Sequence, residues 1–192
     1  MFIVLGIIAA IILYVWSVYN KFVTIKTRIS AATQEIGNQL KRQADLIPNL
    51  VESVKGYMKH EKEIFTEITN ARKAVTGAVE AGNPQRMIEA GSQLQAALAP
   101  IRAVFESTPQ LQAVGPTSKL MDELRDTADK LMYSRRTLID LTADYNVMVV
   151  TVPSNIIAKL FSFKSLDGLK MPATDDYVSV GEDDIKTPEV KL

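Results

Sequence analysis

The feature that most constrains the fold is an uncharged apolar run at the start of the chain. From Phe2 to Trp16 no side chain is charged or strongly polar, and the uncharged run extends to Asn20. A run of roughly 18 residues is long enough to cross a hydrocarbon layer as a helix. Trp16 and Tyr19 gather at one end of the run, where aromatic rings favour the headgroup level of a bilayer. Residues 2–19 are therefore predicted to form a transmembrane helix.

Two other interpretations of this run stay open. A cleaved signal peptide has a basic region before its apolar run and small residues at a cleavage site after it. Here no basic side chain precedes Phe2, and Trp16 and Tyr19 are poor residues for peptidase recognition. A buried core helix usually has a polar stripe, whereas this segment is apolar on all sides. A membrane anchor is the favoured interpretation.

Basic residues beside the run predict its orientation. Lys21, Lys26 and Arg28 follow it closely, and no Lys or Arg precedes it. Basic residues close to a membrane span favour the cytoplasmic side. We therefore expect a single-pass protein of the cell (inner) membrane, with its N-terminus outside and its C-terminal domain in the cytoplasm.

Gly6 and Ala10 form a pair of small residues on one face of the predicted membrane helix. Such a face lets two helices approach closely in lipid, so it is a candidate site for transmembrane helix packing and for a homo-oligomer. The alternative is that small residues are simply common in membrane helices.

A long amphipathic helix is predicted to follow the membrane helix without interruption. Apolar residues recur every three or four positions, which is typical of a helix with a coiled-coil-like seam. This seam consists of Ile25, Ile29, Ala32, Ile36, Leu40, Ala44, Ile47, Val51, Val54, Met58, Phe65 and Ile68. Pro48 lies within it and predicts a kink at residues 45–47, because proline removes one backbone hydrogen bond. The pattern keeps its phase across Pro48 and dissolves at residues 77–84, so we expect one kinked helix.

A second helix is predicted after a turn at residues 81–84, AGNP. Asn83 can cap this helix, and Pro84 suits its first position. The apolar pattern continues to about Glu106. Residues 107–116 contain two prolines and a glycine and predict a loop.

A third long helix is expected from Thr117 or Ser118 to about Val150. Pro153 ends it, because the residue before a proline disfavours helical geometry. A short fourth helix over residues 155–161, with Ser154 as its cap, would close one end of the bundle.

These segments predict an all-α protein: an antiparallel bundle of three long helices plus a short C-terminal helix. The first long helix should be continuous with the transmembrane helix. The expected organisation is a transmembrane helix at 2–19, a helical bundle at 20–170 and an acidic, disordered tail at 171–192. The tail is interpreted either as merely solvated or as an interaction segment.

Composition excludes several classes of function. The chain has no Cys, so it has no disulfide framework, thiolate metal site or Cys nucleophile. Its 22 basic and 22 acidic residues balance, and no basic stripe indicates nucleic acid. The single histidine, His60, lacks the second histidine of a zinc helix, since Ile64 stands at that position. No glycine-rich phosphate loop is present. We therefore expect no cofactor and no enzyme activity.

Acidic residues on two of the predicted helices are interpreted as solvated faces. They are Glu61, Glu63 and Glu67 on the first helix and Asp122, Glu123, Asp126 and Asp129 on the third. Lys130, Arg135 and Arg136 of the third helix are expected to pair with acids of the first.

The stretch QLKRQADLIPNLVESVKGYMKHE at residues 39–61 resembles the signature of the LemA family, most specifically in DLIPNLV. Other matching stretches are YNKFV (19–23), EITNARKAV (67–75) and DYNVMVVTVPSNIIAKLFSF (144–163). The resemblance implies a bacterial or archaeal all-α protein with one N-terminal membrane helix, a short N-terminus outside and no established molecular function. One branch of that family takes part in magnetosome formation.

The chain also departs from the LemA pattern and resembles a divergent member. Ala128 follows Thr127 where the family usually has Glu, and Leu138-Ile139 stands where it usually has Tyr-Asn. Residues 108–117 lack the usual Ala-Asn-x-x-Phe pattern. The polar contacts of the third helix with the first are expected to differ accordingly.

Two function hypotheses follow. The first is a membrane-anchored helical scaffold that binds other membrane or membrane-associated proteins, with Pro48 and Asn49 as a candidate partner site on a bend. The alternative role for these two residues is structural, with Asn49 capping the kink. The second hypothesis is an oligomeric membrane-remodelling or transport-associated component, in which several anchors assemble.

Overall fold

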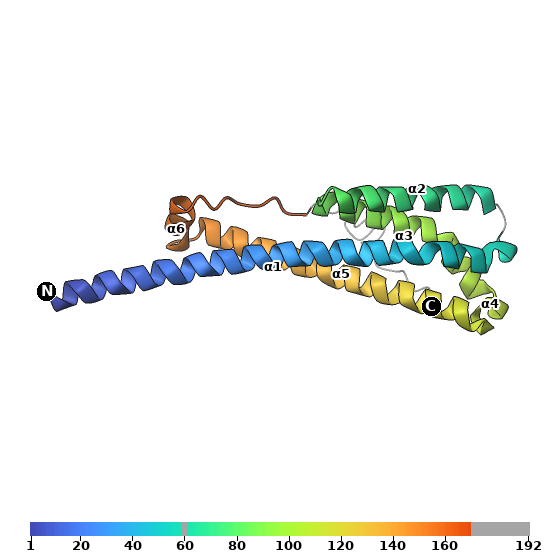
Figure 1. Cartoon of the computed structure of the whole chain (residues 1–192), viewed down its shortest axis with the longest axis horizontal. Helices are drawn as coiled ribbons and strands as arrows, with labels where there is room; N and C mark the ends of the chain where they lie inside the picture. Colours follow the sequence, from blue (N-terminus) through green and yellow to red (C-terminus); the bar gives the residue numbers. More distant parts are fainter. Residues whose placement is uncertain (59–60, 170–192) are drawn as a thin grey trace, which may run out of the picture.

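The protein is an elongated helical bundle with one helix projecting from its end (Figure 1). The computed structural model describes residues 1–58 and 61–169. In these residues the elements are α1 (Phe2–Val54), a 3-10 turn (Lys55–Tyr57), α2 (Glu61–Glu80), α3 (Pro84–Ser107), α4 (Pro109–Ala113), α5 (Gly115–Val150) and α6 (Ser154–Leu160). No strand occurs among them, which confirms the predicted all-α class.

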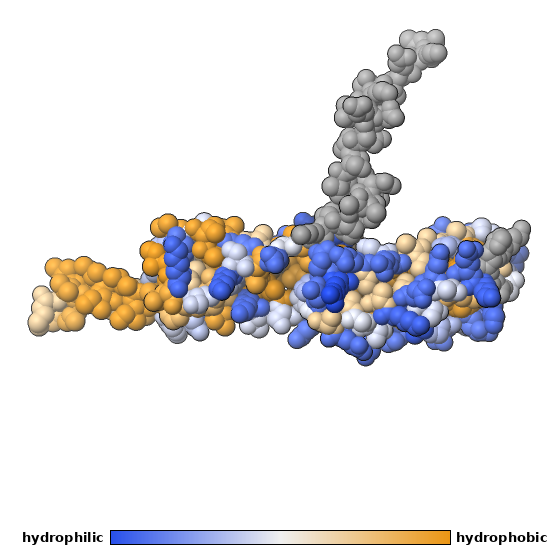
Figure 2. All heavy atoms as spheres, turned by 90° about the horizontal axis from the view of Figure 1, so that it is seen from above, coloured by the Kyte–Doolittle hydropathy of each residue, from blue (hydrophilic) through white to orange (hydrophobic). Residues whose placement is uncertain are grey.

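Helix α1 joins the apolar run to the bundle without a break. It contains 53 residues, which at 1.5 Å per residue corresponds to about 80 Å. The apolar stretch at its start is long enough to cross a membrane, and none of it is buried within the chain. Figure 2 shows this stretch as an apolar rod that extends beyond the more polar bundle. The predicted continuity of the two helices is confirmed, and the full exposure argues against a core helix.

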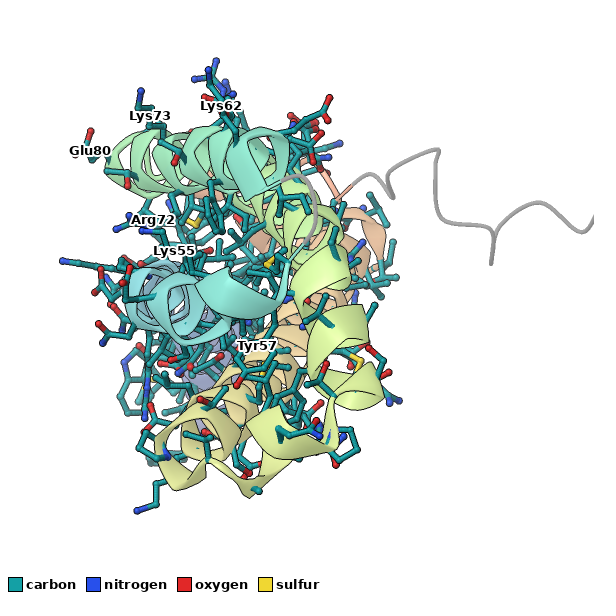
Figure 3. All side chains as sticks on the ribbon, turned by 90° about the vertical axis from the view of Figure 1, so that its right-hand side faces the viewer. Lys55, Tyr57, Lys62, Arg72, Lys73 and Glu80 are labelled. Atoms are coloured by element: carbon teal, nitrogen blue, oxygen red, sulfur yellow. The ribbon has the colours of Figure 1, made fainter. Side chains whose placement is uncertain are left out.

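The expected single helix through residues 25–76 is wrong, because α1 ends at Val54. Helix α1 continues through Pro48, and the chain turns six residues later, where Gly56 lies in the 3-10 turn and Met58 is extended. Glycine disfavours a helix interior by roughly 0.5–1 kcal/mol relative to alanine. Helix α2 then folds back beside α1 and α3 (Figure 3). The bundle therefore has one long helix more than the sequence predicts.

Folding back gives both segments a partner for their apolar stripes. Val54 and Met58 before the turn are buried, as are Ile68 and Val75 on α2. If α1 continued as one straight helix past Val54, Ile68 and Val75 would be exposed to water. Figure 3 shows Arg72 between α2 and α1, while Lys73 points away from the bundle.

The turn from α2 to α3 matches the prediction. The Asn83 side chain accepts a hydrogen bond from the backbone N–H of Arg86 at 3.0 Å, and Pro84 takes the first helical position. Gly82, with φ +60°, has the left-handed conformation that glycine adopts without steric cost. Helix α3 continues through Pro100 to Ser107.

The predicted loop at 107–116 instead contains a short helix. Pro109 begins α4, and Leu111 at its centre is buried. Burial of this leucine explains why a segment rich in loop-forming residues becomes helical. Helix α5 begins at Gly115, slightly before the predicted start, and ends at Val150 as expected.

Helices α1 and α5 form the main seam of the bundle, and α6 closes the end nearest the apolar rod. Most predicted seam residues of α1 and α2 are buried, with Ile29, Val51 and Phe65 partly so. Helix α6 begins at Ser154, whose hydroxyl donates to carbonyls of α5 and the turn instead of capping α6. Beyond α6 the chain runs back along α5, where Asn146 holds it through two hydrogen bonds with the backbone of Leu166, each 2.8 Å. We call residues 162–169 the strap.

Candidate functional site

Pro48 and Asn49 lie beside an open groove near the end of the bundle remote from the apolar rod. The groove has a volume of about 680 Å³ and is formed by α1 and the start of α5. We call it the distal groove; its lining residues are Asn49, Glu52 and Ser53 of α1 and Gly115, Pro116, Lys119, Leu120 and Glu123 of α5. The structure therefore places Asn49 opposite α5, across a hollow.

The side-chain amide of Asn49 is available to a partner. Asn49 is exposed, and its backbone carbonyl accepts a hydrogen bond from the Ser53 hydroxyl at 2.7 Å. Within the described part of the chain its side chain makes no hydrogen bond, either to the backbone around Pro48 or to α5. The amide offers both a donor and an acceptor, the pattern that recognises a polypeptide backbone or a polar side chain.

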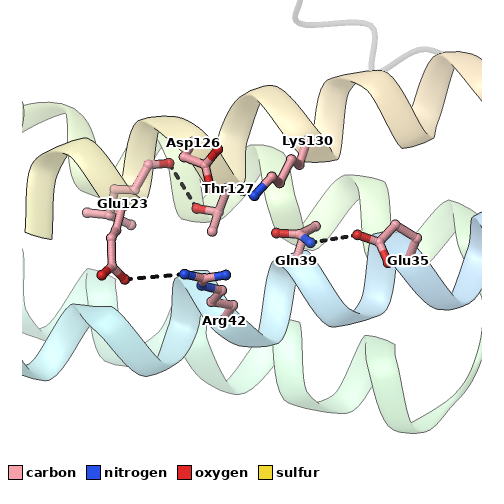
Figure 4. Close-up of polar contacts among 8 residues, drawn as sticks. Glu35, Gln39, Arg42, Glu123, Asp126, Thr127 and Lys130 are labelled. Atoms are coloured by element: carbon pink, nitrogen blue, oxygen red, sulfur yellow. Dashed lines mark hydrogen bonds and ion pairs between the residues drawn. The ribbon is translucent and has the colours of Figure 1, made fainter.

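Charges of both signs surround the distal groove. The guanidinium of Arg42 lies 3.6 Å from the carboxylate of Glu123, and both side chains are half exposed (Figure 4). Lys55 lies 3.9 Å from Glu52 on the other side. Exposed pairs of this kind contribute about 0–1 kcal/mol to stability, so they can exchange partners at small cost.

A second groove runs between α1 and α5 closer to the apolar rod. It has a volume of about 650 Å³, and we call it the proximal groove. Apolar Ala32 and Leu141 line it together with Arg28, Glu35, Asp129, Lys130 and Tyr133. Lys130 pairs with Asp126 on its own helix at 2.7 Å. The expectation that Lys130 pairs with an acid on the first helix is therefore wrong. An ion pair that does cross between α1 and α5 joins Arg42 to Glu123, with the cation on the first helix and the acid on α5.

A buried polar contact between α1 and α3 was missed by sequence reasoning. Gln43 is fully buried and accepts a hydrogen bond from the side-chain amide of Gln95 at 3.2 Å. Arg102 donates in turn to Gln95. Ala128, which replaces the glutamate usual in the resembling family, lines a hollow beside Gln95 between α3 and α5. Ala128 thus lies toward α3. The sequence had instead led us to expect altered polar contacts with the first helix.

The described residues hold no cluster of side chains suited to binding a metal ion. No group of three or more His, Asp or Glu side chains is placed to bind a metal in residues 1–58 and 61–169. His60 lies outside those residues. Helix α2, with its acidic side chains, packs on α3 and α1, and Asp122 of α5 pairs with Arg125 at 3.9 Å. Burial raises the pKa of the Tyr145 phenol, which packs edge-on against Phe22 in the core.

Gly6 and Ala10 lie on the exposed surface of the apolar rod. A Cβ atom added at Gly6 would meet no other atom within 4 Å. The face that they form is therefore free of contacts from the rest of the described chain. Its use in helix packing stays a prediction.

Comparison with known proteins connects this architecture to one family. A model described as the LemA family matches residues 32–181. Magnetosome protein MamQ of Magnetospirillum gryphiswaldense is 25% identical over 172 residues, which cover 78% of this chain and 63% of that protein. Magnetosome proteins MamQ 1 and MamQ 2 of Paramagnetospirillum magneticum are each 25% identical, covering 76% of this chain and 62% of theirs. The chain thus spans less than two thirds of the length of these curated relatives.

Proposed function

The chain belongs to the LemA family, and from this premise we propose that it is a membrane-anchored, non-enzymatic helical scaffold that binds other proteins in the distal groove. The single observation that carries the proposal is the position of that groove on α1, the helix that continues without a break from the apolar rod. Residues 19 and 49 of α1 are separated by 30 helical residues, or about 45 Å at 1.5 Å per residue. A partner in the groove would be held at a fixed height above the bilayer.

The chemistry of the distal groove favours a polypeptide as the partner. Asn49 supplies an unused amide, Lys119 a cation and Glu52 an anion, around the partly buried Leu120. An apolar floor with a polar, charged rim is the usual anatomy of a protein interface. The position of Lys21 and Lys26 just beyond the apolar run supports a cytoplasmic bundle.

Site-specific photocrosslinking in intact cells tests this function. A photoreactive amino acid replaces Asn49 or Lys119 in the distal groove, and Lys73 on the outer face of α2 serves as the control position. We expect Asn49 and Lys119 to give the same discrete adduct with another protein, and Lys73 to give none. Adducts only with a second copy of the chain, or equal labelling from all three positions, would overturn the proposal.

A charge reversal adds a second measurement. Lys119→Glu should lower recovery of the partner from mild detergent at least severalfold, whereas Lys73→Glu should leave it unchanged. Equal recovery with both variants contradicts binding in the groove.

The open face at Gly6 favours a second candidate function, an oligomeric membrane-remodelling or transport-associated component. Small residues at an interface let membrane helices pack closely. Gly6→Leu should then abolish a defined homo-oligomer in native membranes. Val4→Leu, on the opposite side of the helix, should not. A monomeric wild-type chain would rule this function out.

A further inference from the structure

The corner between α5 and α6 exposes apolar side chains on the outside of the bundle. Ile157 and Ala158 of α6 are buried and attach the helix to the bundle, yet its opposite face is also apolar. The exposed side chains, 44–78% accessible, are Val147, Val150, Val152, Ile156, Leu160 and Phe161. We call these six residues the apolar corner. A surface helix in water normally presents a polar face opposite its buried one.

The apolar corner lies at the level where the apolar rod of α1 ends. The rings of Phe161 and Tyr19 are 4.8 Å apart, and Tyr19 is the last residue of the predicted transmembrane segment. Phe163 stacks on Phe22 of α1 at 4.6 Å. Figure 1 shows α6 across the end of the bundle beside α1, and Figure 2 shows an apolar surface that continues from the rod onto this end.

Basic side chains outnumber acidic ones around this level, where Asp144 and Asp167 are the nearest acids on α5 and the strap. Residues 145–166 contain no acidic side chain and two lysines, Lys159 and Lys164, both exposed. On α1 the first acidic residue is Glu35, after Lys21, Lys26 and Arg28. Basic side chains beside an apolar surface suit anionic lipid headgroups, with their hydrocarbon stems in the apolar layer.

We propose that the apolar corner inserts into the headgroup layer of the membrane that α1 crosses and forms a second lipid contact. The proposal rests on the proposed anchoring of α1. An amphipathic surface at the interface gains from burial of its apolar side chains and from attraction to anionic lipid. With two contacts, α1 and the corner, the bundle keeps one rotation and tilt relative to the bilayer, so the distal groove keeps one orientation.

Lipid quenching of a fluorophore tests the second contact, and the cysteine-free chain allows single labels. The full chain is reconstituted in vesicles of phosphatidylethanolamine and phosphatidylglycerol, with an environment-sensitive fluorophore on Ile156→Cys or Leu160→Cys. Ile8→Cys reports on the anchor. Met132→Cys is the matched control, because Met132 is an apolar side chain of α5 that is 67% exposed but lies outside the corner.

We expect brominated lipids to quench the fluorophore at Ile8, Ile156 and Leu160 and not at Met132. Bromines near the headgroup should quench Leu160 best, and bromines near the chain ends should quench Ile8 best. Quenching at Ile8 with none at Ile156 and Leu160 would overturn the second contact and leave the anchor intact. No quenching at Ile8 would overturn the anchoring itself. A blue-shifted but unquenched label at Leu160 would mean that protein covers the corner, which also overturns the proposal.

Discussion

At Gly91 helix α3 approaches Leu40 of α1 closely. A Cβ atom added there would lie 2.9 Å from Cδ2 of Leu40 and 3.6 Å from Cδ2 of Leu131. Leu40 is fully buried, so its side chain has little room to move. Gly77 in α2 is a natural comparison, because a Cβ atom there meets nothing within 4 Å. A substitution at Gly91 therefore tests side-chain packing, whereas the same substitution at Gly77 tests helix propensity alone.

Leucine at these two positions should have opposite effects on stability. Gly91→Leu should lower the free energy of unfolding by about 1–3 kcal/mol, the usual cost of overpacking a core. Gly77→Leu should raise it by about 0.5–1 kcal/mol, because glycine is a poor helix former. Urea unfolding in mild detergent, followed by circular dichroism, measures both. A stabilised Gly91→Leu variant would show that α1 and α3 do not pack as described.

Gln43 shows what residue spacing could have predicted. Ile36, Leu40, Gln43, Ile47, Leu50 and Val54 follow one another in steps of three and four, and all are fully or almost fully buried. The predicted seam included Ala44, which is also buried, and did not include the polar Gln43. Spacing alone marks Gln43 as a core position, whereas its partner Gln95 comes from α3 and depends on tertiary packing.

At the scale of elements, apolar periodicity identifies faces better than it identifies ends. The pattern keeps its phase from Val54 through Met58 toward Ile68, so one helix and two helices in a hairpin look alike in sequence. Asn83 and Pro84 were predictable because capping is local. The turn after Val54 was not, because its stabilisation comes from α2 packing against α3, a contact between segments that periodicity does not connect.

We predict that the strap is held against α5 mainly by the side chain of Asn146. The Asn146 side chain accepts from the backbone N–H of Leu166 and donates to its carbonyl. Asn146→Ala removes both bonds, each worth about 0.5–1.5 kcal/mol, so the Leu166 amide should exchange with solvent roughly tenfold faster or more. Hydrogen exchange of the full chain in detergent measures this.

Two internal controls accompany the Asn146 variant. Asn146→Asp keeps the acceptor and should retain part of the protection at Leu166. The amide of Phe163, which donates to the carbonyl of Ala158, should be unaffected in both variants. Equal exchange at Leu166 in wild type and Asn146→Ala would show that apolar packing of Leu166 alone holds the strap.

At the scale of the whole molecule, the distribution of charge bears on the proposed topology, in which the bundle lies on one side of a membrane. The basic residues Lys21, Lys26 and Arg28 come after the apolar rod. The contacts of Phe161 with Tyr19 and of Phe163 with Phe22 bring Lys159 and Lys164 near the same level. The first group was visible in the sequence. The second was not, because the return of α5 and α6 to the end of the rod is a property of the fold. Only the first group favours the cytoplasmic side by the positive-inside rule, because that rule counts basic residues close to the span in the chain.

Cysteine labelling of intact cells tests this topology. Ser165 in the strap is exposed, and Phe2 stands at the start of the rod, so each accepts a single cysteine in a chain that has none. A membrane-impermeant maleimide should label Phe2→Cys from outside and leave Ser165→Cys unlabelled until the cells are permeabilised. Because Ser165 lies close to the proposed lipid contact, labelling after permeabilisation is the control that separates sidedness from shielding. Labelling of Ser165→Cys in intact cells would place the bundle outside, where the distal groove would meet a different set of partners.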